Sequence, residues 1–199
     1  MRVCPQVEPA ALENGGEAEG KQRASIHVLG DVKVGKTSIV NRYNNNAFTE
    51  EYTPSIGTKV SKHNVEIKDP TGQTQGMLVN LMIWDLLGSR DHAMLHKTFY
   101  AGAEGGIVVC DITREDTREH ISFWVDQLRT VVPKGTPIFI AINKVDGVTK
   151  DIKEKVIHEV RELCKKLNVA HIEVSARTGD NINTMFYTLS ETMLVTRPF

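Results

Sequence analysis

The eight residues GDVKVGKT at positions 30–37 carry the most specific chemical signal in the sequence. They match the pattern GxxxxGK[ST] of a phosphate-binding loop and lie between a predicted strand and a predicted helix, where such a loop must lie. Backbone N–H groups of the loop and the positive end of the helix can surround phosphate oxygens. Lys36 adds a charge near the β- and γ-phosphates, and the Thr37 hydroxyl can bind Mg²⁺. The alternative is an incidental glycine turn before a helix. If the loop binds phosphate, the expected binding residues are Asp31, Val32, Lys33, Val34, Gly35, Lys36, Thr37 and Ser38.

A second motif, NKVD at residues 143–146, indicates which base is bound. Asp146 can accept hydrogen bonds from both the N1–H and the exocyclic amine of guanine, a pair that adenine does not offer. Asn143 suits a bridge between the base and neighbouring loops, and the alkyl stem of Lys144 can lie along the purine face. NKxD alone is a common loop tetrapeptide. The tripeptide SAR at residues 175–177, where a backbone N–H could meet guanine O6, strengthens the prediction of GTP and GDP binding.

These motifs need an alternating α/β framework, and the sequence predicts one. Apolar runs and helical periods take turns from Ala24 onward. Two runs, at residues 106–110 and 137–142, lack polar alternation, as expected for central strands covered on both faces. We therefore expect a doubly wound, mainly parallel sheet. The other expected strands are residues 26–29, 59–68, 77–84 and 170–174, and the expected helices are residues 36–46, 121–128, 152–167 and 181–195.

Two further structural predictions can be made from local patterns. The sequence DPTG at residues 69–72 favours a hairpin that joins the extended stretches on either side, which would give one antiparallel edge pair. The helix at residues 152–167 is expected to bury one stripe, made by Ile152, Val156, Val160, Leu163 and Leu167.

Composition limits the classes of protein that the chain can be. Its 199 residues are enough for one domain, and its formal net charge of −1 gives no general attraction to nucleic acid or to acidic membranes. Residues 1–22 contain four glutamates and few large apolar groups, so we expect a flexible tail followed by a domain at 23–199. The chain has no apolar run of membrane-spanning length, no myristoylation glycine and no cysteine after Cys164. We expect a soluble, cytoplasmic monomer without a direct lipid anchor.

The order of these motifs resembles that of the Ras superfamily of small GTPases, from about Ala24 to Val195. The stretch FTEEYTPSIG at residues 48–57 looks like the switch I segment of Ras- and Rab-like members, and WDLLG at residues 84–88 looks like switch II. The resemblance implies a P-loop NTPase G domain with a mostly parallel six-stranded sheet, one antiparallel edge strand and helices on both faces. The nucleotide contacts expected outside the phosphate loop are Phe48, Ser55, Gly88, Asn143, Lys144, Asp146, Ser175, Ala176 and Arg177.

The same resemblance assigns roles to the switch residues. Phe48 would pack on the guanine, or else is a core residue. Mg²⁺ would be bound by Thr37 and Ser55 directly and by Asp85 through water, and the Gly88 N–H would contact the γ-phosphate. Ser55 stands where the family keeps a threonine, which preserves the hydroxyl oxygen.

Two positions depart from the family's hydrolytic pattern. Ser89 stands where most members have the glutamine that orients the attacking water, and Val32 stands where Ras has glycine and would crowd the γ-phosphate. No confident catalytic residue is therefore identified, and hydrolysis is expected to be slow. Arg90 could supply a charge in cis but is better explained as a solvated helix residue. His92 and His96 have a metal-ligand spacing without a third ligand nearby, which favours exposed switch residues.

The resemblance implies a Mg²⁺-dependent guanine-nucleotide switch whose switch segments are recognised by effector, exchange-factor and activating proteins in a nucleotide-dependent way. An interaction scaffold that stays loaded with GTP and does not hydrolyse it is the main alternative, favoured by Val32 and Ser89. A P-loop kinase or ATPase is a third possibility, and Asp146 argues against it. The subfamily stays open.

Overall fold

The computed structural model describes residues 22–48, 58–68, 77–86 and 100–196. Its centre is a six-stranded sheet in the order β2-β3-β1-β4-β5-β6. β2 runs antiparallel to β3, and every other neighbouring pair is parallel. The strands are β1 (Gln22–Gly30), β2 (Lys59–Ile67), β3 (Met77–Asp85), β4 (Gly105–Asp111), β5 (Ile138–Asn143) and β6 (Ala170–Glu173).

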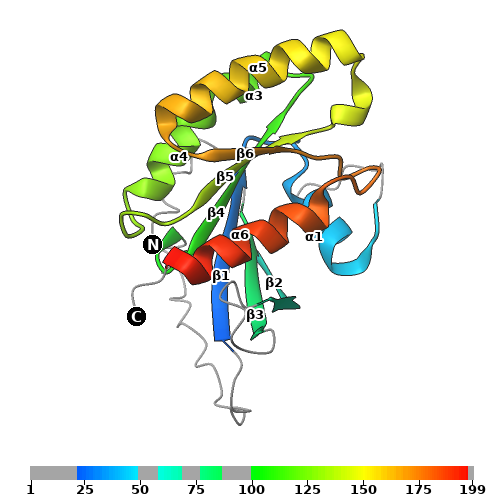
Figure 1. Cartoon of the computed structure of the whole chain (residues 1–199). Helices are drawn as coiled ribbons and strands as arrows, with labels where there is room; N and C mark the ends of the chain where they lie inside the picture. The colour runs from blue at the N-terminus through cyan, green and yellow to red at the C-terminus, as the bar shows by residue number, and fades with distance from the viewer. Residues whose placement is uncertain (1–21, 49–57, 69–76, 87–99, 197–199) are drawn as a thin grey trace, which may run out of the picture.

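Helices cover both faces of this sheet (Figure 1). One face packs against α1 (Lys36–Asn45) and α6 (Ile182–Thr196), and the other packs against α4 (Ile121–Arg129) and α5 (Lys150–Leu167). β4 and β5 are buried along their whole length, and their side chains alternate between the two core clusters. The shorter helical elements are α3 (Glu115–Glu119) and the 3₁₀ turn η2 (Val145–Gly147).

The predicted fold class is confirmed in its layers, its parallel centre and its antiparallel β2–β3 edge pair. The stripe predicted for α5 is wrong at Ile152, which is 51% exposed. The buried stripe begins one turn later, at Val156, because Ile152 lies in the first turn of the helix. The sequence does not predict α3, since its five residues are mostly charged and show no apolar period. The predicted turn at residues 69–72 lies outside the described residues, and so does the tail predicted for residues 1–22, except Gln22, which begins β1. Among the described residues, no helix is long and apolar enough to cross a membrane.

The topology gathers polar residues at one edge of the sheet. β1, β3, β4 and β5 run in the same direction, so their carboxyl ends lie at the same edge of the sheet. The ends are Gly30, Asp85, Asp111 and Asn143. Ligands of open α/β sheets bind outside the carboxyl ends of the strands, where the strand order reverses. β1 lies at that reversal, between β3 and β4.

Candidate functional site

The loop after β1 has a backbone that only glycine can supply at two positions. Gly30 and Gly35 have φ values of 134° and 99°. A Cβ atom on Gly30 would overlap the carbonyl oxygen of Val109 on β4, and one on Gly35 would overlap the side-chain amide of Asn143. The loop is therefore pressed against the ends of β4 and β5, and Gly35 leads directly into α1. The loop therefore ends at the N-terminus of α1, the kind of helix end that can bind phosphate.

Asn143 joins the phosphate loop to the loop after β6. Its side-chain amide nitrogen donates to the carbonyl of Val34 at 2.8 Å, and its side-chain oxygen accepts the N–H of Ala176 at 3.1 Å. The residue is 1% exposed, so both bonds are shielded from water. Asn143 thus joins two loops of the protein, and its predicted contact with the base stays a prediction.

Lys144 is the second residue that ties the NKVD segment to the phosphate loop. Its backbone is left-handed, with φ 66°, and its Nζ donates to the carbonyl of Lys33 at 3.0 Å. The same Nζ lies 2.6 Å from Oδ2 of Asp111, which is buried at the end of β4. The two interactions stretch the lysine side chain across the site, which leaves its alkyl stem available as a flat apolar surface.

Lys36 is buried at the centre of the loop. Its Nζ donates to the carbonyls of Gly30 and Asp31, at 2.9 and 2.7 Å. Burial lowers the pKa of Lys36 to about 8, although the carboxylates of Asp85 and Asp31 oppose this shift. A phosphate group beside the ammonium would favour its charged form. A nucleotide phosphate beside Lys36 would therefore raise the pKa of the ammonium and stabilise its charge.

Thr37 and Asp85 form the candidate metal position. The Thr37 hydroxyl donates to Oδ2 of Asp85 at 2.5 Å, and Oδ1 of Asp85 is buried without a hydrogen-bond partner among the described residues. Burial raises the pKa of Asp85, and the Thr37 hydrogen bond and Lys36 lower it in part. An unpaired carboxylate oxygen beside a hydroxyl fits a hard cation such as Mg²⁺, which takes one or two protein oxygens and completes its shell with phosphate and water. The described residues contain no cluster of three or more His, Cys, Asp or Glu that could hold a metal ion.

The predicted base-recognition residues lie together at the other end of the site. Oδ1 of Asp146 accepts the Ser175 hydroxyl at 2.6 Å, and the Ser175 hydroxyl oxygen accepts the N–H of Thr178 at 3.0 Å. No hydrogen bond from the described residues reaches Oδ2 of Asp146, and the Arg177 guanidinium lies 4.0 Å from it. Ser175 thus fixes the orientation of the carboxylate. The Ala176 N–H, expected near guanine O6, donates to Asn143 in this structure.

Phe48 lies at the start of the segment that resembles switch I. Its ring is half-buried against the core cluster beneath α1 and α6, and the Arg42 guanidinium lies 5.9 Å from the ring centroid. Arg42 also donates to the carbonyls of Ala176 and Arg177, at 2.9 and 2.6 Å. Arg42 therefore links α1, Phe48 and the loop after β6. No sequence pattern indicates this role, because the two carbonyls are more than a hundred positions away.

Asp31 has a role in the loop that its motif position does not indicate. Its carboxylate accepts the indole N–H of Trp124 at 2.8 Å and lies 2.6 Å from Nδ1 of His120. The side chain is 9% exposed and points toward α4. Asp31 therefore anchors the phosphate loop to the helix beneath it, while its backbone remains part of the loop. Sequence reasoning does not identify His120 and Trp124 as site residues.

Val32 lies at the outer rim of the loop. Its side chain is 46% exposed, and its carbonyl accepts a hydrogen bond from the Arg114 guanidinium at 2.9 Å. Arg114 also pairs with Asp116 at 2.6 Å on the surface. Several predicted residues lie outside the described residues, namely Ser55, Gly88, Ser89, Arg90, His92 and His96.

The sequence is similar to known proteins over most of its length. Residues 25–195 match the sequence model of the Ras family. The chain is 31% identical to the Ras-related protein Rab-5B of Plasmodium falciparum, over 84% of this chain and 76% of the relative. It is 32% identical to human Ras-related protein Rab-22A, over 83% and 80% of the two chains. It is also 31% identical to the GTP-binding nuclear protein GSP1 of Encephalitozoon cuniculi, over 83% and 73%.

Proposed function

Since the chain belongs to the Ras family of small GTPases, we propose that the loops at residues 30–38, 143–146 and 175–177 hold GTP or GDP. The family makes the chain a GTP-binding molecular switch and a GTPase in general terms. What we propose is the assignment of that function to particular residues. The observation that carries it is Asn143, whose buried amide bonds the phosphate loop on one side and the loop after β6 on the other.

Guanine selection is assigned to Asp146. Its Oδ1 is oriented by Ser175, which leaves a carboxylate edge to accept the N1–H and the amine of guanine. Lys144 lies across the same region, with its Nζ held by the Lys33 carbonyl and by Asp111, and its stem can contact the purine face. Phe48 would cover the base from the α1 side. Guanine O6 would take the Ala176 N–H in place of Asn143, or share it.

Phosphate and metal binding is assigned to the loop and to the residues around Lys36. The Lys36 ammonium would leave the carbonyls of Gly30 and Asp31 and turn to the β- and γ-phosphates. Thr37 would bind Mg²⁺, and Asp85 would hold one of its water molecules. When bound, the metal neutralises charge on the phosphates. Ser55 and Gly88 complete the proposed γ-phosphate contacts, and effectors, exchange factors and activating proteins are proposed to contact the switch segments.

We further propose that hydrolysis is slow. Val32 is exposed at the rim of the phosphate loop, where its branched side chain would oppose a water-orienting group or an arginine finger. Ser89 is too short to orient the attacking water. Ras itself turns over at roughly 3–5 × 10⁻⁴ s⁻¹ without an activating protein, and we expect a lower rate here.

Two measurements on the whole chain test these proposals. Calorimetry with Mg²⁺ should detect binding of GDP and GTP and none of ATP, and Asp146→Asn should weaken guanine binding; base preference unchanged by that substitution would refute the assignment. Single-turnover hydrolysis should then be slower than the Ras value and should rise in a Val32→Gly, Ser89→Gln double variant. A purified protein carrying mostly GTP, with no rise in that variant, would favour the non-hydrolysing scaffold instead.

A further inference from the structure

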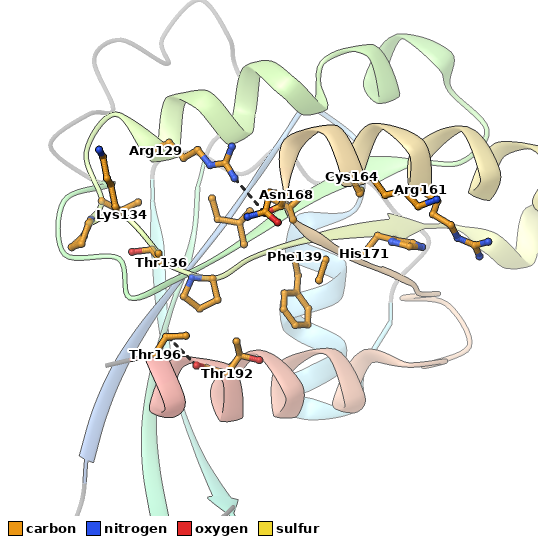
Figure 2. Close-up of a pocket in the computed structure, with 18 residues that line it drawn as sticks. Arg129, Lys134, Thr136, Phe139, Arg161, Cys164, Asn168, His171, Thr192 and Thr196 are labelled. Carbon is orange, nitrogen blue, oxygen red and sulfur yellow. Dashed lines mark hydrogen bonds between the residues drawn. The ribbon is translucent and has the colours of Figure 1, made fainter. Parts of the chain in front are cut away.

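A second concave region lies at the end of the sheet opposite the proposed nucleotide site. It is a cavity of about 1020 Å³ between the last turns of α5 and α6, where β5 and β6 begin, and we name it the α5–α6 groove. Figure 2 shows Lys134 at one end of this groove, Arg161 and His171 at the other, and the Phe139 ring between them. The groove therefore combines charged ends with an apolar floor.

The charge of the groove is of one sign. Its lining includes Arg129, Lys134, Arg161 and Lys165, and it includes no aspartate or glutamate among the described residues. Lys165 is paired with Glu162 at 2.7 Å, and Arg129 donates to the carbonyl of Leu167 at 2.6 Å, at the end of α5. Within the described part of the chain, Lys134 and Arg161 make no ion pair, and both are exposed. Two cations are thus available to an acidic ligand.

The surface around these cations fits a peptide better than a compact anion. Phe139 and Pro137 lie on the floor, and the hydroxyls of Thr192 and Thr196 are already used in bonds to carbonyls of α6. Burial and the nearby Arg161 lower the pKa of His171, and Glu173 opposes this shift in part. A ligand that alternates carboxylates with small apolar groups would satisfy both the ends and the floor.

The chain itself contains a segment of that composition. Residues 1–21 contain four glutamates against Arg2 and Lys21, and residues 7–13 read VEPAALE, with a glutamate near each side of an apolar centre. Residue 22 begins β1, whose first residues lie at the same end of the sheet as the groove. Charge complementarity and covalent attachment both point to this segment.

The distances allow it to reach. Val28 of β1 is level with Ala170 of β6 through the registers of β4 and β5, and Gln22 lies six residues before Val28. Strand spacing and rise then put the start of β1 about 25 Å from the start of β6. The chain from Glu13 to Gln22 can span about 30 Å, and from Glu8 about 46 Å. A tether of this length gives a local concentration that makes a weak contact effective.

We propose that residues 7–13 dock in cis in the α5–α6 groove, with Glu8 and Glu13 paired to Lys134 and Arg161 and with Leu12 against the floor at Phe139. The contact is electrostatic and exposed, so it weakens with salt. A segment docked there would occupy a face remote from the proposed nucleotide site, and an acidic partner of that face would have to displace it.

The test uses a nitroxide on Cys4, three residues before the docking segment. Cys110 and Cys164 are buried, and burial raises the pKa of their thiols to about 12 and about 11, so a maleimide label at pH 7 is directed to Cys4. A Cys4→Ser variant that takes up no label confirms this. The readout is paramagnetic broadening of the backbone amide signals of Thr136, His171 and Thr192 in the full chain at low salt.

We expect these signals to broaden in the wild type and to recover in a Lys134→Glu, Arg161→Glu variant, with the docked-to-free ratio falling about fivefold, as two exposed ion pairs allow. A Lys62→Glu, Lys155→Glu variant changes the net charge equally outside the groove and should keep the broadening. Adding Glu8→Lys and Glu13→Lys to the groove variant should restore it. Equal broadening in the groove and control variants, none in the wild type, or binding of an acidic peptide in trans without any Cys4 effect would each overturn the proposal.

Discussion

The bridge made by Asn143 can be tested by replacing it with alanine. The side chain is 1% exposed and makes two hydrogen bonds, one to the Val34 carbonyl and one from the Ala176 N–H. Alanine removes both bonds and leaves a buried carbonyl and a buried N–H unsatisfied. Each such group costs about 1–3 kcal/mol. We therefore expect Asn143→Ala to lower the free energy of unfolding by about 3 kcal/mol, and the melting temperature by about 6–12 °C.

Melting without nucleotide and with excess Mg²⁺ and GDP separates the structural effect from the binding effect. A ligand that binds only the folded state stabilises it by RT ln(1 + [L]/Kd), so the increment between the two melts reports the affinity. Because Asn143 fixes both loops, we expect that increment to shrink, by about 1.4 kcal/mol for each tenfold loss of affinity.

Asn183→Ala is the matched control for this experiment. Asn183 is exposed on α6, far from the phosphate loop in the chain, and its replacement should stay within about 0.5 kcal/mol of the wild type. If Asn143→Ala melts within about 2 °C of the wild type and gains as much from GDP, the two hydrogen bonds do not hold the site together, and the residue assignments around them lose their main support.

Three further substitutions test other parts of the molecule. His27 is buried against Trp84 at a ring-centroid distance of 5.4 Å, and burial lowers its pKa to about 4. Because the unfolded chain takes up this proton below pH 6.5 and the folded chain does not, the free energy of unfolding should fall by up to about 3 kcal/mol between pH 6.5 and 4. Urea titrations should show less of this loss in His27→Phe. Trp124→Phe removes a hydrogen-bond donor from the buried Asp31 carboxylate and should lower the free energy of unfolding by about 1.5–3 kcal/mol in chemical denaturation. A loss no larger than that of an exposed substitution would show that His120 alone anchors Asp31. Arg42→Lys keeps the charge but cannot reach both the Ala176 and Arg177 carbonyls, so a fluorescent GDP analogue should dissociate about fivefold faster, a change of about 1 kcal/mol, and an unchanged rate would contradict the proposed link.

The parts of the fold that the sequence predicts are those whose signal is local. The uninterrupted apolar runs that become β4 and β5 are typical of central strands, and the turn chemistry between residues 59–68 and 77–84 predicts the antiparallel pair that β2 and β3 form. Periodicity predicts which side of α5 faces the sheet but not where along the helix burial begins, and for that reason it wrongly places Ile152 in the core. α3 has too few residues and too many charges to produce a pattern at all.

The candidate site divides in the same way. The phosphate loop and the NKVD segment are each a continuous stretch of sequence, so the chemistry proposed for them follows from residue types and spacing alone. The residues that hold these segments in place cannot be predicted from the sequences of the segments themselves. Asp31 and Trp124 are 93 positions apart, and Arg42 and Arg177 are 135 apart. Such pairs arise only when the sheet order brings α1, α4 and the loop after β6 to one edge, and no local pattern encodes that order.

These long-range contacts couple the proposed base-recognition loop to the proposed phosphate loop. Asn143 connects the carbonyl of Val34 to the N–H of Ala176, and Arg42 connects α1 to the same loop after β6. If guanine takes the Ala176 N–H, Asn143 loses one of its two partners, and this change reaches the phosphate loop through the bond to Val34. Whether a base contacts this loop should therefore affect the affinity for the phosphates. The affinity for a guanosine diphosphate should therefore differ from what the base and the phosphates contribute when each is measured separately, because binding of one changes the contacts available to the other.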